Sequence, residues 1–115
     1  MTNNGTVTTD KSVLLSSATV TYVYGGVTAL ANNATPPIYG GATFFTTGGT
    51  TTITDFDNGT VGQTITILSE HAVTITDGTH IILGGSADFD MAASDSLTLV
   101  LKADNKWYET ARMVN

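Results

Sequence analysis

The densest chemistry in the sequence is a run of two aromatic residues beside an acid and a base. These residues are Trp107, Tyr108, Glu109 and Arg112. Exposed aromatic side chains can stack on sugar rings, so the four residues are a candidate receptor- or glycan-binding surface. On a strand, however, Trp107 and Glu109 would share one face and Tyr108 would take the other. We therefore favour a structural role, in which one aromatic residue covers the core and Arg112 pairs with Glu109 or with a carboxylate of a neighbouring subunit.

Two histidines and a group of aspartates are the other candidates for acid–base or metal chemistry. His71 and His80 lack further ligands at a spacing typical of metal sites, so we expect solvated or locally hydrogen-bonded side chains. Asp88, Asp90 and Asp95 could supply the pair of carboxylates that hydrolyses a glycosidic bond. Their spacing fixes no distance between two carboxyl groups, and aspartate is common in turns. We expect a charged surface loop there.

Residues 55–59, Asp-Phe-Asp-Asn-Gly, start like a calcium-binding loop but depart from that pattern. The glycine comes one place early, and Thr66 stands where a glutamate should close the loop, so we expect a turn after a strand end. The sequence has no cysteine, and it has no nucleophile elbow or phosphate-binding loop. We therefore expect no catalytic residue, no metal site, no cofactor and no enzymatic activity.

The composition favours a β-sheet protein that binds neither nucleic acid nor membrane. Among 115 residues, four are Lys or Arg and ten are Asp or Glu, which gives a formal net charge of −6. A chain so poor in cations has no stripe to neutralise nucleic-acid phosphates or anionic lipids. No apolar run approaches the length of a membrane helix, and the first residues lack a signal-peptide pattern. The abundant Thr, Val and Ile suit a pleated sheet, because branching at Cβ stiffens the side chain.

Apolar residues alternate with threonine in three segments, 63–68, 72–76 and 97–101. This period of two places one set of apolar side chains on a single face of each segment. The members of that set are Ile65, Ile67, Val73, Ile75, Leu97 and Leu99. Turn signals rich in Asp, Asn and Gly separate strands that recur about every 8 to 15 residues. We therefore predict an all-β fold, either a short-stranded β-sandwich or a β-helix-like module.

Residues 1–49 are patterned differently and contain several Gly-Gly pairs. Residues 13–15 and 20–24 look like two strands, and residues 27–31 like a short helical turn. Gly-Gly pairs cost conformational entropy on folding, so this segment needs outside support. We predict an N-terminal anchoring segment followed, after a soft boundary, by a regular β module over residues 50–115.

The apolar faces of the regular module are a difficulty for a single chain. Each clear apolar face is one residue wide, and aromatic residues that could fill a large core are few. Closing three copies about an axis would bury these faces against each other and cover strand edges that otherwise invite aggregation. We therefore expect an intertwined homotrimer, with the six alternating apolar residues in its core or at its three-fold interface.

Residues 52–112 contain short segments whose order is informative when they are taken together. They are Ile53-Thr54-Asp55-Phe56, Asn58-Gly59, Gly62-Gln63-Thr64-Ile65-Thr66-Ile67, Val73-Thr74-Ile75-Thr76-Asp77-Gly78, Ile81-Ile82-Leu83, Ala87-Asp88-Phe89, Leu97-Thr98-Leu99, and Trp107-Tyr108-Glu109 with Arg112. This order resembles a β-rich module of bacteriophage virions, often found at the C-terminal end of tail fibres, tailspikes and head-surface fibres. The resemblance covers about half of the chain, and it implies a homotrimer with interwoven or β-helical strands.

The resemblance implies a structural protein of the virion. A tail fibre usually needs a long shaft, and this chain of 115 residues shows no repeats, so we favour a capsid decoration or cement protein, or a head-surface fibre. Residues 1–49 would then bind the major capsid protein or another virion protein, and contacts between capsid subunits would stabilise the shell. The alternative is a receptor- or glycan-binding tip module of a tail fibre or tailspike, with host surface glycan as its partner. The expected location is the capsid surface, or the tail in the alternative.

Overall fold

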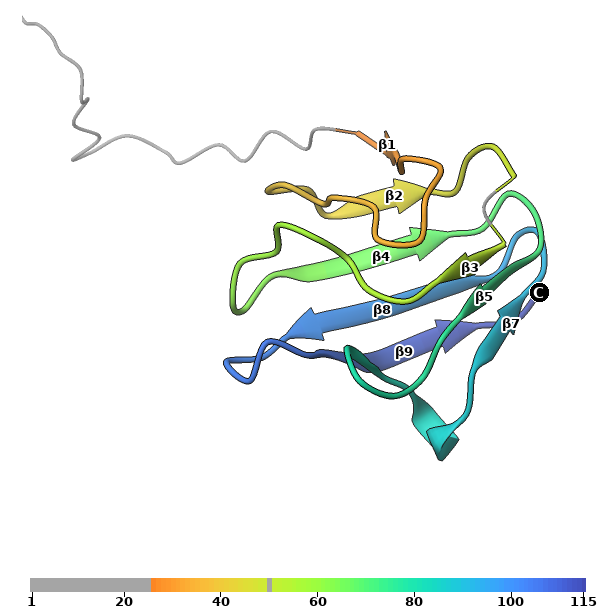
Figure 1. The fold of residues 1–115 in the computed structure, drawn as a ribbon. Coiled ribbons are helices and arrows are strands. Elements are labelled where there is room, and N and C mark those ends of the chain that lie inside the picture. The colour runs from red at the N-terminus through yellow and green to blue at the C-terminus, as the bar shows by residue number, and fades with distance from the viewer. Residues whose placement is uncertain (1–25, 50) are drawn as a thin grey trace, which may run out of the picture.

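The computed structural model describes residues 26–49 and 51–115, which form an all-β fold of two sheets. The predicted all-β class is confirmed, whereas the strands predicted at 13–15 and 20–24 lie outside the described residues. The strands are β1 Thr28–Ala29, β2 Thr43–Phe45, β3 Thr52–Ile53, β4 Thr64–Leu68, β5 Val73–Ile75, β6 Ile81–Ile82, β7 Phe89–Met91, β8 Ser96–Leu101 and β9 Trp107–Met113, and a short 3-10 helix, η1, spans Gly84–Ser86. The larger sheet has the order β1-β2-β4-β8-β9-β6, and the smaller sheet has the order β3-β5-β7. In Figure 1, five strands of the larger sheet, β1, β2, β4, β8 and β9, follow one another from top to bottom.

The first five strands wind in coils, and β2 to β5 alternate between the two sheets. β1, β2 and β4 pair in parallel in the larger sheet, and β3 and β5 pair in parallel in the smaller one. The segments between strands stack as well, with a parallel bridge between Pro37 and Asp57. The side-chain amide of Gln63 donates hydrogen bonds to the carbonyls of Ile38, at 2.9 Å, and Gly41, at 2.8 Å. These contacts stack successive coils of the chain on one another.

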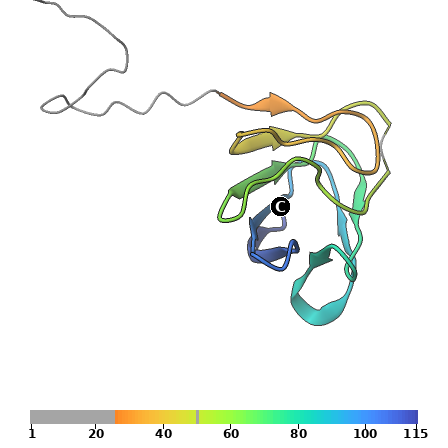
Figure 2. The same cartoon turned by 60° about the vertical axis from the view of Figure 1, so that its left-hand side comes forward.

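The remaining strands complete a sandwich around these coils. β8 runs antiparallel to both β4 and β9, and β7 runs antiparallel to β5. The two sheets face each other as two layers, and the teal segment near residue 80 closes the lower end (Figure 2). The chain therefore combines a coiled first half with a second half that is antiparallel except for β6, which pairs in parallel with β9.

The helical turn predicted for residues 27–31 is not present. Residues 28 and 29 form β1, and the N–H of Leu30 donates to the carbonyl of Phe45 at 2.9 Å. A segment this short cannot nucleate a helix on its own, whereas pairing with β2 buries the Leu30 side chain. The described part of the N-terminal segment thus shares one sheet with the regular module, and the boundary near residue 50 stays a prediction.

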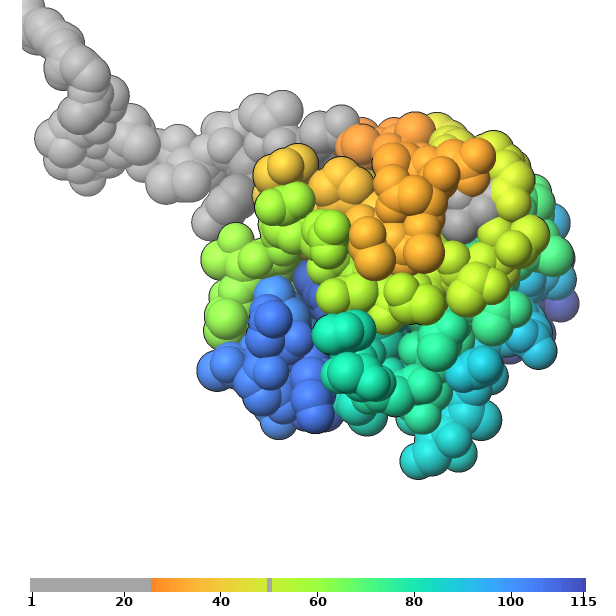
Figure 3. All heavy atoms as spheres, in the orientation of Figure 1, coloured from red at the N-terminus to blue at the C-terminus, as the bar shows by residue number. Residues whose placement is uncertain are grey.

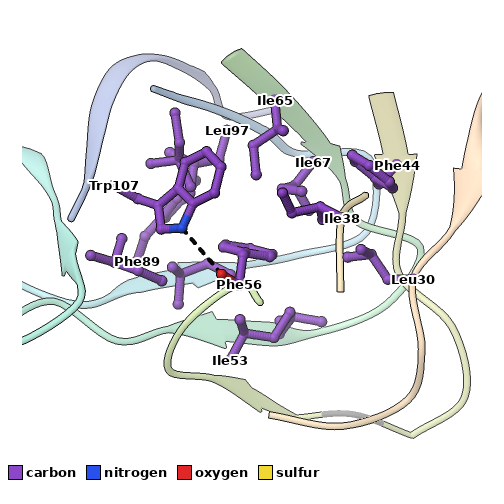
Figure 4. Close-up of a cluster of buried hydrophobic side chains, with 14 of the residues drawn as sticks. Leu30, Ile38, Phe44, Ile53, Phe56, Ile65, Ile67, Phe89, Leu97 and Trp107 are labelled. Atoms are coloured by element: carbon purple, nitrogen blue, oxygen red, sulfur yellow. Dashed lines mark hydrogen bonds between the residues drawn. The ribbon is translucent and has the colours of Figure 1, made fainter. Parts of the chain in front are cut away.

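The core lies between the two sheets of one chain. The six apolar residues predicted from the alternation are 0 to 2% exposed. Figure 4 shows Ile38 and Phe44 beside Ile67 of β4, with Leu30 nearby and Ile53 of the smaller sheet across the core. The smaller sheet and the N-terminal coils cover these faces within one chain, so all six residues lie in its core, and the homotrimer stays a prediction.

Candidate functional site

Trp107 lies in the core and does not form part of the surface. Its side chain is 1% exposed, and its ring meets Phe56 edge-on, with centroids 6.0 Å apart and planes at 77°. The indole Nε1–H donates to the Phe56 carbonyl at 3.3 Å (Figure 4). A Cβ added at Gly59 would come within 2.6 Å of the indole, so the turn closes tightly over it. Trp107 is therefore removed from the candidate glycan-binding surface, because a buried ring offers no face to a sugar.

A β-bulge in β9 places Glu109 and Arg112 on one side of the sheet. Glu109 lies opposite Leu99 of β8, and Arg112 lies opposite Leu97, with a register shift between these pairs. Residues three apart on a regular strand point to opposite faces, and the extra residue in β9 cancels that alternation. Arg112 then donates from Nε to Glu109 Oε2 at 2.6 Å and from Nη2 to Oε1 at 2.7 Å. The predicted pairing of Arg112 with Glu109 is confirmed, within one chain.

This ion pair covers one end of the core. The Arg112 guanidinium lies over the Phe89 ring, with Cζ 3.9 Å from the ring centroid. Glu109 Oε1 also accepts the backbone N–H of Gly84 at 2.8 Å. The bond from Arg112, together with that from Gly84, holds the pKa of the Glu109 carboxyl below its usual range. The pair therefore holds β9 against β7 and η1, and its role is structural.

We predict that acid weakens the fold through Glu109. Since its pKa is lowered on folding, its contribution to the free energy of unfolding is present above the unfolded-state value near 4.5 and is lost as the pH falls through the lowered pKa. Glu109→Gln should therefore be less stable than the natural chain at about pH 7, and the difference should shrink towards about pH 3. Urea denaturation of both proteins across this range measures it, and a difference that stays constant in acid would contradict the account.

Tyr108 points to the other side of β9 and is partly exposed. Its hydroxyl donates to Asp104 Oδ2 at 2.5 Å, and Lys102 Nζ lies 4.4 Å from the ring centroid. The hydrogen bond raises the pKa of Tyr108 and lowers that of Asp104. Tyr108 is thus the aromatic residue of the predicted group that reaches the surface, at a margin that carries charges of both signs.

Asp95 lies buried inside the fold, which corrects the expectation of a surface loop for this residue. Its side chain accepts the backbone N–H of Asn115 at 2.9 Å and of Ala92 at 2.8 Å. These bonds, that from Asn115 first, lower the pKa of the Asp95 carboxyl. Ser69 also bonds the Asp95 carbonyl, at 3.2 Å. Asp95 therefore ties Asn115 to the turn before β8, and the two backbone N–H groups satisfy its buried carboxylate.

Asp88 and Asp90 remain on the surface, and each accepts a hydrogen bond from β5 or its turn. Asp88 Oδ1 accepts the N–H of Asp77 at 2.9 Å, and Asp90 Oδ1 accepts the hydroxyl of Thr74 at 2.8 Å. Both residues are exposed, as expected of a charged surface segment. These two carboxylates hold strands and turns together in the described fold.

A groove that sequence reasoning missed opens beside the smaller sheet, with a volume of about 390 Å³. Its lining consists of Thr54, Thr76, Asp77, Gly78, Thr79 and His80. Thr54 and Thr76 follow β3 and β5, which pair in register, and Figure 3 shows the yellow-green and teal residues of these segments side by side. His80 is half exposed, and its Nδ1 lies 3.7 Å from Asp55 Oδ2. Thr-Ile-Thr occurs at 52–54 and 74–76 beside the groove, but it also occurs at 64–66 in β4, so this repeat alone could not have located the groove.

For metal sites and membrane helices, the structure can be searched only over the residues that it describes. Within residues 26–49 and 51–115, no group of three or more His, Asp or Glu side chains is placed to hold a metal ion. Residues 55–59 contain the parallel bridge of Asp57 and a bend at Asn58, whose φ is 64°, and Phe56 is buried. His71 is partly exposed in the turn between β4 and β5. No helix in the described ranges is long and apolar enough to cross a membrane.

Comparison with known proteins provides no relative. A scan against models of protein families, a search of curated proteins and a search of solved structures each found no match to this chain. The function must therefore be inferred from the residues and their geometry.

Proposed function

We propose that this chain is a structural protein of a bacteriophage virion, a homotrimeric capsid decoration or cement protein or a head-surface fibre. In this proposal residues 1–49 bind the major capsid protein or another virion protein. The main support is that most of the segments that carry the resemblance to phage modules contribute buried residues to one core, from Ile53 in β3 to Trp107 in β9. Their order along the chain therefore corresponds to a single packed unit.

The geometry also suits a mechanical role. Parallel coils, a closed sandwich and the clamp between Glu109 and Arg112 link elements that are distant in the sequence. A rigid body of this kind that binds only neighbouring capsid subunits in the assembled shell stabilises the shell by linkage.

The test is a cryo-EM map of the phage particle that carries this chain. The proposal predicts density for the two sheets on the capsid surface, with three copies around a three-fold axis. Density confined to the tail would contradict a role as a capsid decoration protein and favour a tip module of a tail fibre or tailspike.

The alternative is a receptor- or glycan-binding tip module of a tail fibre or tailspike, and the groove beside the smaller sheet favours it. The groove combines hydroxyl, carboxylate and imidazole groups that can hydrogen-bond to a sugar. A glycan array with the purified protein tests this function. Saturable binding that is lost in His80→Ala and kept in His71→Ala, the second histidine as matched control, would support it. Absence of binding by the natural chain would argue against it.

A further inference from the structure

The outward face of the larger sheet carries no charged side chain on β2, β4 and β8. We call this surface the neutral face, and its central residues are Thr43, Phe45, Thr66, Leu68, Thr98 and Val100. They alternate with buried residues, and Thr43, Thr66 and Thr98 lie opposite one another across the three strands. The Thr66 and Thr98 hydroxyls bond to each other at 3.1 Å, beside the apolar side chains of the same face.

The neutral face continues across β9 because of the β-bulge. The register opposite β8 turns Glu109 and Arg112 inward, so the residues that point outward are Tyr108, Ala111 and Met113. Met113 is 50% exposed. At the margin, Lys102 and Asp104 contact Tyr108, so charges occur at the rim. An uncharged centre with a charged rim is typical of protein–protein interfaces.

The distribution of charge indicates which partner fits this face. The chain has a formal net charge of −6, so two copies repel each other wherever their carboxylates meet. The smaller sheet is unsuitable for self-association, because Asp90 projects from β7 and Asp77 lines the adjoining groove. The neutral face is a surface on which a second copy approaches without opposing carboxylates.

We propose that copies of this chain meet through the neutral face, which would place the outer side of the larger sheet around the three-fold axis. The inference rests on the proposed homotrimer and assigns its interface. Of the two places predicted for Ile65, Ile67, Val73, Ile75, Leu97 and Leu99, the core or the three-fold interface, the single chain puts them in its core, which leaves the interface to other residues. The exposed Val27 precedes Ala29, which pairs with Phe45 of the neutral face, so the apolar surface extends to the β1 edge.

The test compares two identical substitutions on opposite sides of the molecule. Thr66→Glu adds a carboxylate at the centre of the neutral face, and Thr52→Glu adds one on the exposed side of β3. We expect Thr66→Glu to raise the concentration at which the assembly dissociates by about 100-fold or more, because three like charges would meet at the interface. Thr52→Glu should keep the mass of the natural chain in analytical ultracentrifugation. Val100→Glu is the second variant on the neutral face, and circular dichroism establishes that each variant is folded.

The outcomes separate the interface from the assembly itself. Suppose that Thr66→Glu and Val100→Glu are folded and are trimeric at the same concentrations as the natural chain. The neutral face is then not the interface, and the homotrimer stands. If the natural chain is monomeric, both the homotrimer and this inference are overturned. In that case, binding to phage particles that Thr66→Glu abolishes and Thr52→Glu keeps would assign the face to a capsid partner.

Discussion

Replacing Ile67 by aspartate should leave the chain unfolded under conditions in which the natural sequence folds. Ile67 is 0% exposed at the middle of the larger sheet, opposite Leu97 of β8. An ionised carboxylate there would be buried without a partner, at a cost of at least about 3 kcal/mol, which is a large part of the stability of a small domain. Far-UV circular dichroism with thermal melting measures the loss.

The control for this prediction is Thr52→Asp on β3, which lies outside the neutral face. Thr52 is exposed, so its carboxylate stays in water and the free energy of unfolding should change by no more than about 1 kcal/mol. An Ile67→Asp protein that melts cooperatively and as late as Thr52→Asp would mean that the core assigned to the larger sheet is wrong.

Trp107→Ala should lower the free energy of unfolding by about 3–5 kcal/mol, as expected for deletion of a large buried aromatic side chain. The indole packs against Phe56, bonds its carbonyl and fills the space under the Gly59 turn. Its removal would leave a cavity among residues of both sheets. Urea denaturation followed by circular dichroism measures this effect without relying on tryptophan fluorescence.

Trp107→Phe is the matched variant, because it keeps an aromatic ring and removes the Nε1–H donor. We expect it to lose less stability than Trp107→Ala. A Trp107→Ala protein as stable as the natural chain would instead indicate that Trp107 is exposed, and the glycan-stacking role would then have to be reconsidered. The burial of Trp107 also means that loss of glycan binding in Trp107→Ala would not identify a binding residue.

The sequence predicts those parts of the fold that depend on local alternation. The period of two at Ile65 and Ile67, and at Leu97 and Leu99, is a local property of a strand with one buried face, and both strands are present. The pairing of β1 with β2 and of β3 with β5 joins residues that are separated along the sequence by about one turn of the coil. Strands of two or three residues carry too little periodicity to reveal that stacking.

The candidate site was predictable to a similar extent. Alternation places Trp107 and Glu109 on one face, and the structure has both facing inward. The bulge that turns Arg112 to the same side depends on the register between β8 and β9, which no local pattern encodes. The neutral face could not be predicted from the sequence for a related reason. Thr43, Thr66 and Thr98 become neighbours only when their strands pair.

The central claim is that this chain is a homotrimeric structural protein, and its mass in solution tests that claim most directly. Sedimentation equilibrium of the natural chain at micromolar concentration should give three times the chain mass of 11.9 kDa. The same experiment on Thr66→Glu should give the mass of one folded chain. A natural chain that sediments with the mass of a single copy at these concentrations would contradict the homotrimer and the interface assigned to it.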